Sequence, residues 1–83
     1  MLKVSVISPE AVLFEGESDS VVAPAYDGEI GILTGHAPLM ALLGEGQLRL
    51  GGSSGRRFNV SGGFMQVLNN DVRVVTEKAT PAS

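Results

Sequence analysis

The sequence predicts an all-β fold, an antiparallel β-sandwich or barrel built from short strands. Short apolar runs recur about every ten residues, which is the spacing of antiparallel sandwiches and barrels. The chain of 83 residues contains 11 glycines, and they are spaced through it as turn residues would be. No window keeps apolar residues at helical spacing over three turns, and Pro81 would interrupt a helix begun near Glu77.

The length and composition limit the chain to one small, well-packed domain. With no Cys, disulfides and Cys-based zinc sites are excluded, so stability must come from burial. Only 18% of residues are charged, and the net charge of -3 gives no electrostatic footprint for nucleic acid or an anionic membrane. No apolar run approaches a membrane span, and no signal peptide precedes the first alternating run. We expect a soluble, intracellular protein.

In the first third of the chain, the pattern predicts strands at residues 3–8, 11–15 and 20–23. Residues 3–8 alternate with period two, so Val4 and Val6 share one face of a strand. The third run meets Pro24, which lacks the amide that a central strand must donate. We therefore expect the third strand to end at Pro24 or to lie at a sheet edge there.

In the second half, the pattern predicts strands at residues 47–50, 57–61, 64–68 and 72–75. The turns between them are predicted at 51–55, Gly62-Gly63 and 69–71. Residues 79–83 are small and polar, and we expect a frayed end or the start of a linker. The domain is therefore assigned to residues 1–78.

One stretch, Ile30 to Gly44, carries no formal charge and contains the only His of the chain. Its apolar side chains could fill the core from an irregular strand. Alternatively, glycines and Pro38 bend the stretch, so that some of these side chains cannot point inward and form a partner surface. One segment can do both. The residues concerned are Ile32, Leu33, Leu39, Leu42 and Leu43.

We predict no catalytic, cofactor-binding or metal-binding residues. Asp27 and Glu29 are two neighbours on one turn, whereas an acid–base pair needs carboxylates across a cleft. His36 has neither a Cys nor a second His with which to share a metal, which favours a structural or interface role. The glycines before it lack the Lys-Ser/Thr of a phosphate loop. Arg56-Arg57 is interpreted as a charge pair at a strand edge rather than a nucleic-acid contact.

The segment from Gly28 to Leu39, GEIGILTGHAPL, resembles the signature segment of the epsilon subunit of F-type ATP synthases. That signature is a glycine-acid-x-glycine turn followed by Ile-Leu-Pro-x-His-Ala/Thr-Pro-Leu. A second family segment, Ser-Gly-Gly-Phe-x-x-Val, is matched by residues 61–67, and the first hairpin of the family by 6–10 and 14–16. Thr34 replaces the usual Pro, which we expect to cost some turn rigidity.

The resemblance implies a flattened β-sandwich of about ten strands, with no catalytic activity, at the foot of the rotor's central stalk. One surface would pack on the gamma subunit and one end would meet the ring of c subunits, so that ion-driven rotation reaches gamma and ATP synthesis. The implied location is peripheral, at the cytoplasmic face of a bacterial plasma membrane or, less favoured, the stromal face of the thylakoid. No cofactor is implied.

Carried over by position, the resemblance implies two partner-binding sets. The turn facing the c ring would consist of Gly28, Glu29, Ile30 and Gly31, with Glu29 available for a basic residue on a c-subunit loop. The gamma contact would comprise His36, Leu39, Met40 and Ala41, together with Ser8 on an adjacent first strand. The flexible thioether of Met40 suits an irregular contact. We expect this contact to bury about 1,000 Å² or more.

The resemblance covers essentially the whole chain but only the amino-terminal half of a usual family member. The helical hairpin that normally follows is absent, so its inhibitory and ATP-sensing functions are not assigned and no nucleotide is expected. Either the epsilon subunit is naturally short, or the chain is a truncated domain. One alternative is a free-standing β-sandwich binding module, which would need exposed aromatic residues; a chain with no Trp and one Tyr, Tyr26, is poor in them. The other is a hydrolase, which one His and no Cys barely permit.

Overall fold

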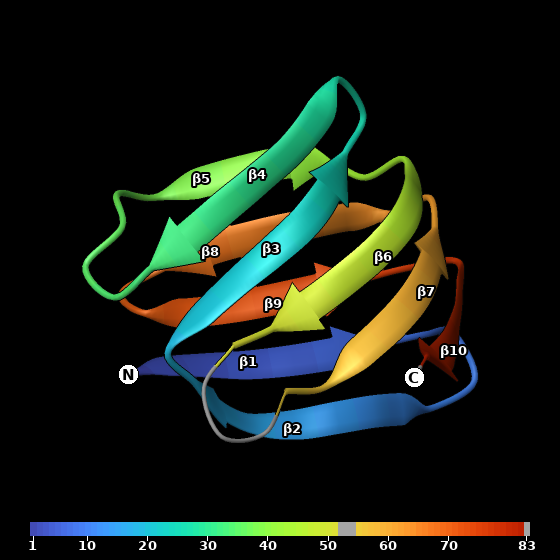
Figure 1. Ribbon diagram of the computed structural model, residues 1–83, viewed down its shortest axis with the longest axis horizontal. Coiled ribbons are helices and arrows are strands. Elements are labelled where there is room, and N and C mark those ends of the chain that lie inside the picture. The colour runs from blue at the N-terminus through green and yellow to red at the C-terminus, as the bar shows by residue number, and fades with distance from the viewer. Residues whose placement is uncertain (52–54, 83) are drawn as a thin grey trace.

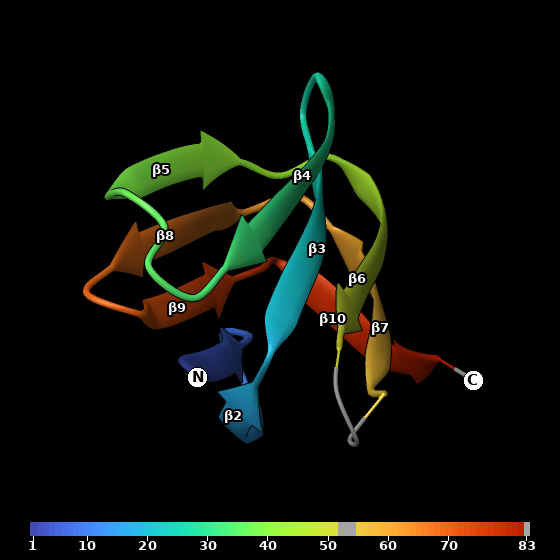
Figure 2. The ribbon, with the colours of Figure 1, turned by 60° about the vertical axis from the view of Figure 1, so that its left-hand side comes forward.

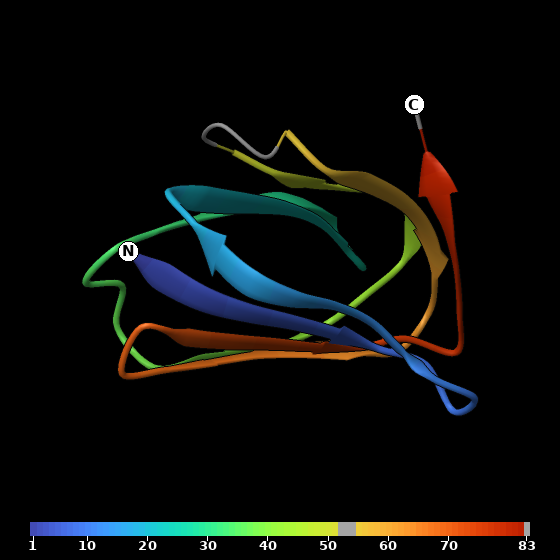
Figure 3. The same ribbon diagram turned by 90° about the horizontal axis from the view of Figure 1, so that it is seen from below.

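The computed structural model describes residues 1–51 and 55–82, which form ten strands in two stacked sheets (Figures 1 and 3). The strands are β1 (Leu2–Ile7), β2 (Val12–Ser18), β3 (Ser20–Ala25), β4 (Gly28–Leu33), β5 (Leu39–Leu42), β6 (Glu45–Leu50), β7 (Arg57–Ser61), β8 (Phe64–Leu68), β9 (Asp71–Val75) and β10 (Lys78–Ala82). Sheet A has the order β2-β1-β9-β8-β5, and sheet B has the order β10-β7-β6-β3-β4. The predicted all-β sandwich is confirmed, with one parallel pair, β1 and β9, among antiparallel neighbours.

The core lies between the inner faces of the two sheets and follows from the period-two alternation of the strands. In β1, for example, Leu2, Val4 and Val6 are almost fully buried, whereas the residues between them face outward. Burying one such side chain stabilises the fold by about 1.5–3 kcal/mol. The remaining buried apolar residues are Val21, Ala23, Ile32, Leu43, Leu48, Leu50, Phe58, Val60, Met65, Val67, Val72 and Val74.

The Ser-Gly-Gly-Phe segment has a structural explanation at the turn between β7 and β8. Gly62 and Gly63 have φ angles of 72° and 102°, which favour glycine. A Cβ on Gly63 would also collide with the carbonyl oxygen of Val75. The buried hydroxyl of Thr76 lies 2.9 Å from the Gly62 carbonyl oxygen, to which it donates a hydrogen bond. The two glycines therefore allow the turn to pack closely on the end of β9.

The seven strands predicted from the sequence pattern correspond to β1, β2, β3, β6, β7, β8 and β9. Three further strands were not predicted from alternation. Two of them, β4 and β5, lie within the glycine-containing stretch 28–44, and β10 occupies residues 78–82, where a tail was expected. β10 pairs with β7 along its whole length and forms an edge of sheet B, the position that Pro81 allows. The predicted turn at 51–55 falls partly outside the described residues, as does Ser83.

β3 ends at Ala25, one residue beyond Pro24, but it lies inside sheet B, so the alternative that places Pro24 at a sheet edge is wrong. Pro24 pairs with Glu29 of β4, and its carbonyl oxygen accepts a hydrogen bond of 2.8 Å from Gly44 N on the other side. The ladder between β3 and β6 reaches only as far as Val22. Since the nitrogen of Pro24 faces the side where this ladder has ended, its missing amide interrupts no pairing.

Candidate functional site

The first candidate surface is the hairpin of β3 and β4. Gly28 to Gly31, predicted to be a turn, are instead the first four residues of β4, an edge strand of sheet B. The turn itself consists of Tyr26 and Asp27, because Ala25 pairs with Gly28. Its tip projects beyond the rest of the sandwich (Figures 1 and 2). Tyr26 is 82% exposed there and belongs to neither of the two partner-binding sets that the resemblance implies.

Glu29 already has a partner within the chain. Both of its carboxylate oxygens accept hydrogen bonds from Nη2 of Arg49, at 2.9 and 3.1 Å. Arg49 lies on β6, so the ion pair spans the outer face of sheet B across β3. The two side chains remain 59% and 42% exposed, and an exposed pair contributes only about 0–1 kcal/mol. The ion pair therefore orients the carboxylate of Glu29 and leaves it accessible to solvent.

The second candidate surface is centred on β5, which forms an edge of sheet A and pairs only with β8. Leu39 is half-buried and packs against the core, and Ala41 is also half-buried. The residues that alternate with them face outward: Met40 is 63% exposed and Leu42 is 69% exposed.

The stretch 30–44 thus serves both the core and the surface. Ile32 and Leu43 are buried, whereas Leu33 is 65% exposed. The core interpretation therefore holds for Ile32 and Leu43, whereas Leu33 and Leu42 do not point inward.

His36 lies in the connection between β4 and β5, which passes from sheet B to sheet A. The imidazole is half-buried, and its Nδ1 lies 2.7 Å from the carbonyl oxygen of Ala37. The neighbouring Gly35 N donates a hydrogen bond of 2.7 Å to Oδ1 of Asn70, on the turn between β8 and β9. Among residues 1–51 and 55–82, no group of three His, Asp or Glu side chains could hold a metal ion.

Ser8 is not brought together with the other residues of its predicted set. It follows β1, and both β9 and β8 lie between β1 and β5, so the expectation that the first strand is adjacent is wrong. Ile7 is level with Leu42 across the sheet, whereas the loop of His36 is bound to the turn at the opposite end. Ser8 therefore lies diagonally across sheet A from His36. Its hydroxyl is 3.3 Å from the carbonyl oxygen of Ala11.

A row of apolar side chains crosses the outer face of sheet A at the end of β1 that leads to Ser8, level with Leu42 of β5. The register aligns it across all five strands, and we call it the outer row: Leu42, Phe64, Val75, Ile7 and Val12. Leu42 and Val12 are 69% and 57% exposed, and the other three are half-buried. Directly paired side chains lie about 4.5–5.5 Å apart, so the row is continuous. It runs from Leu42 on β5 to Val12 on β2, and its fourth member, Ile7, directly precedes Ser8 in the sequence.

Sequence reasoning could not find the outer row. The alternation of each strand indicates which residues face outward, but the row depends on the register of five strands that are far apart in the sequence. The signal available was weaker: two members of the row, Leu42 and Ile7, are sequence neighbours of residues that the resemblance selects, Ala41 and Ser8.

The two candidate surfaces meet at a groove of about 610 Å³, which is lined by residues 25–30 and 39–42. Three of the residues predicted to face the c ring and three of those predicted to contact gamma lie in its walls. The walls are also joined by the backbone: Tyr26 N donates a hydrogen bond of 2.8 Å to the carbonyl oxygen of Leu42. Ala25 forms a bridge with Leu43 just behind it. The hairpin and β5 are thus fixed to one another.

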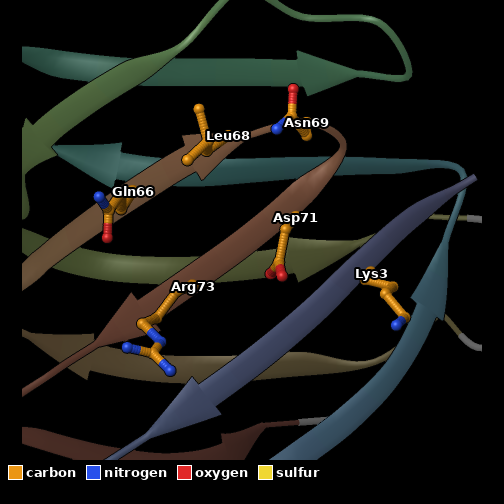
Figure 4. A pocket seen from close by; sticks show the side chains of 6 residues that line it. All are labelled: Lys3, Gln66, Leu68, Asn69, Asp71 and Arg73. Atoms are coloured by element: carbon orange, nitrogen blue, oxygen red, sulfur yellow. The ribbon is translucent and has the colours of Figure 1, made fainter.

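A second hollow, of about 440 Å³, lies beside the outer row on the same face of sheet A (Figure 4). Figure 4 shows its side chains spread along three strands, with Asp71 between Lys3 and Arg73. The other lining residues are Gln66, Leu68 and Asn69. None of the six is a Ser, Thr, Cys or His. In the described part of the chain, no helix has the length and apolar character needed to cross a membrane.

Comparison with known proteins gives consistent matches along the chain. The sequence model of the family described as "ATP synthase, Delta/Epsilon chain, beta-sandwich domain" matches residues 1–82. The ATP synthase epsilon chain of Leptospira borgpetersenii is 48% identical over 77 residues, covering 92% of this chain and 61% of the relative. That of Syntrophomonas wolfei is 45% identical over 80 residues, covering 94% and 58%. The chain therefore spans about three-fifths of the length of these curated relatives, 61% and 58%.

Solved structures show the same fold. A chain in the cryo-EM structure of the Euglena gracilis mitochondrial ATP synthase, OSCP/F1/c-ring, matches with a TM-score of 0.87 at 24% identity, covering 96% of this chain and 52% of that one. A chain in the central stalk/c-ring structure from Tetrahymena thermophila matches with a TM-score of 0.75 at 19% identity, covering 95% and 65%. At these identities the likeness establishes the fold alone.

Proposed function

The chain belongs to the family of the ATP synthase delta/epsilon-chain β-sandwich domain, and from this premise we propose that it is a non-catalytic central-stalk domain. In this role it links the gamma subunit to the ring of c subunits and transmits ion-driven rotation to gamma, which couples the rotation to ATP synthesis. It acts peripherally, at the cytoplasmic face of a bacterial membrane. It needs no bound cofactor, because its task is mechanical.

The observation that carries this proposal is the outer row together with Met40. Five aligned apolar side chains, two of them more than half exposed, form a continuous apolar strip on the outer face of one sheet. Apolar patches of this kind mark interaction sites, since removing apolar surface from water contributes about 25 cal/mol per Å². We assign the strip to gamma, with Ser8 next to Ile7. The proposed contact continues along β5 through Ala41 and Leu39 to His36, which precedes that strand.

The hairpin of β3 and β4 is suited to the c ring. Its tip projects from the sandwich, with Tyr26 and Asp27 outermost and Gly28 to Gly31 behind them (Figure 2). The exposed ion pair with Arg49 leaves Glu29 able to exchange partners, because such a pair contributes little stability. A basic residue on a c-subunit loop would then replace or supplement Arg49.

Transmission of torque requires that the two contacts do not move independently. The hydrogen bond from Tyr26 N to the Leu42 carbonyl and the bridge between Ala25 and Leu43 connect the hairpin directly to β5. Gly44 N adds a third link, to the carbonyl oxygen of Pro24. A displacement imposed on the hairpin is therefore passed to β5 through short backbone contacts rather than through a flexible loop.

The proposal is tested by mixing the chain with the purified gamma subunit of the same ATP synthase. We expect a one-to-one complex that elutes from a size-exclusion column ahead of either component and survives dilution to micromolar concentration. Separate elution of the two proteins, with the chain shown to be folded by circular dichroism, would overturn the proposed function.

A further inference from the structure

The turn between β8 and β9 is formed by Asn69 and Asn70, between the paired residues Leu68 and Asp71. Both asparagines have positive φ angles, 50° and 62°, as two-residue hairpin turns of type I′ require. Asn and Gly are the residues that adopt this conformation readily. The backbone conformation would therefore accept Gly at either position. The turn does not require the Asn side chains, so they can form hydrogen bonds with other segments.

Asn70 joins its own turn to two other parts of the chain, the start of β1 and the connection between β4 and β5. Its carbonyl oxygen accepts a hydrogen bond of 2.8 Å from Lys3 N at the start of β1. Its side-chain Oδ1 accepts one of 2.7 Å from Gly35 N, in the connection between β4 and β5. Asn70 is half-buried, whereas Asn69 is exposed and its side chain has no hydrogen-bond partner in the described part of the chain.

Apart from this bond, the hydrogen bonds of the connection, residues 34–38, in the described part of the chain are to itself and to the adjoining end of β4. His36 N donates to the Leu33 carbonyl oxygen at 3.1 Å, and the imidazole lies against Ala37. Within residues 1–51 and 55–82, the bond between Gly35 N and Asn70 Oδ1 is the one hydrogen bond that ties this connection to a distant segment. Figure 1 shows the connection passing beside the turn of β8 and β9.

We propose that Asn70 is a positioning residue for the gamma contact: its side chain fixes the connection that carries His36 and delivers the chain into β5. The inference rests on the proposed function. Without this bond, residues 34–38 would be free to move, and gamma would have to order them on binding. With it, the connection is already in place, so Asn70 acts through Gly35 without needing to touch the partner.

Three variants distinguish the effect of the Asn70 side chain from the effect of the turn conformation. Asn70→Gly removes Oδ1 but keeps the positive φ, Asn69→Gly makes the same change at the neighbouring position without touching the connection, and Asn70→Asp restores an acceptor. The two measurements are the hydrogen-exchange rate of the Gly35 amide and the affinity for purified gamma. A change in the stability of the turn alone would affect Asn70→Gly and Asn69→Gly similarly in both measurements.

For Asn70→Gly we expect the Gly35 amide to exchange at least about tenfold faster and gamma to bind about fivefold more weakly, the effect of one net hydrogen bond. We expect Asn69→Gly to stay within about twofold of the unmodified chain in both measurements, and Asn70→Asp to recover most of the loss. Asn70→Gly binding gamma as tightly as Asn69→Gly would overturn the positioning role alone. If the unmodified chain does not bind gamma, the proposed function fails and the role in gamma binding fails with it.

Discussion

Arg49 and Glu29 form an ion pair across the width of an intervening strand, with the carboxylate of Glu29 accepting two hydrogen bonds from the guanidinium at 2.9 and 3.1 Å. The pair lies on the outer face of sheet B, close to the hairpin proposed to meet the c ring. Glu29 therefore has an observed contact inside the domain, the ion pair with Arg49, and a proposed contact with the c ring. Substitutions on the two sides of the pair can therefore distinguish them.

Glu29→Lys should leave the domain folded and impair coupling. It replaces the ion pair by two like charges, but both groups are more than two-fifths exposed, so solvent screening limits the loss to under about 1 kcal/mol. For a domain of this size that lowers the melting temperature by no more than about 4–8 °C. ATP-driven proton pumping by the assembled enzyme in membrane vesicles is the readout, and we expect it to fall.

Arg49→Gln is the matched control, because it also breaks the ion pair but leaves the carboxylate of Glu29 free. We expect proton pumping close to that of the unmodified enzyme. Equal impairment by both variants would show that the ion pair itself matters, and full pumping by Glu29→Lys would reject the assignment of Glu29 to the c ring.

Met40→Asp should abolish binding to gamma without unfolding the chain. The side chain is 63% exposed on edge strand β5 and is not part of the core, so a carboxylate there costs the monomer little. In a complex, the same carboxylate would be buried against an apolar partner at a cost of several kcal/mol. Pull-down with gamma and thermal denaturation measure the two effects.

Leu33→Asp provides the comparison, since Leu33 is 65% exposed but lies on the outer face of the other sheet. We expect this variant to bind gamma normally. Retained binding by Met40→Asp would remove β5 from the interface, and unfolding of the Met40→Asp monomer would show that Met40 supports the core.

Local pattern was enough to predict most of the sandwich. Alternation in β1 placed Val4 and Val6 on one face of a strand, and that face is the buried one, because each strand has one buried and one solvated face. It did not find β4, where glycines replace the expected alternation. Pro24 was misjudged because its effect depends on which side of the strand has a neighbour, a property of the sheet rather than of the residue.

The candidate site depended still more on tertiary arrangement. The resemblance selected Glu29 and Met40 correctly as exposed residues, but the partner of Glu29, Arg49, lies two strands away in the sheet. The outer row and the bond from Gly35 to Asn70 likewise join segments far apart in the sequence. Such relationships follow from register and strand order, which a single sequence does not determine.

Gly63→Ala should destabilise the domain strongly. Gly63 has a φ of 102°, and a Cβ there would collide with the backbone carbonyl of Val75, which cannot move without disturbing β9. We expect a loss of at least about 2 kcal/mol in the free energy of unfolding, measured with urea.

Gly35→Ala is the control: its φ of 86° is also positive, but no atom lies within 4 Å of the added Cβ. Its loss should be about 1 kcal/mol, and equal losses would remove the steric explanation.

Arg56→Ala should weaken the fold where the sandwich closes around Phe14 and Phe58. The guanidinium carbon of Arg56 lies 5.3 Å from the centroid of each ring, and the rings themselves are 6.2 Å apart, so one cation covers two aromatic faces. The two adjacent arginines, interpreted from the sequence as one edge pair, therefore have different environments. Loss of a partly exposed cation–π contact costs about 0.5–1 kcal/mol. Because two rings are involved, we expect the free energy of unfolding, measured with urea, to fall by an amount near the upper value.

Arg57→Ala is the control, because it removes an equal charge from an exposed strand position. It should change the free energy of unfolding by less than about 0.5 kcal/mol. Matching losses for the two variants would mean that the aromatic contact contributes nothing.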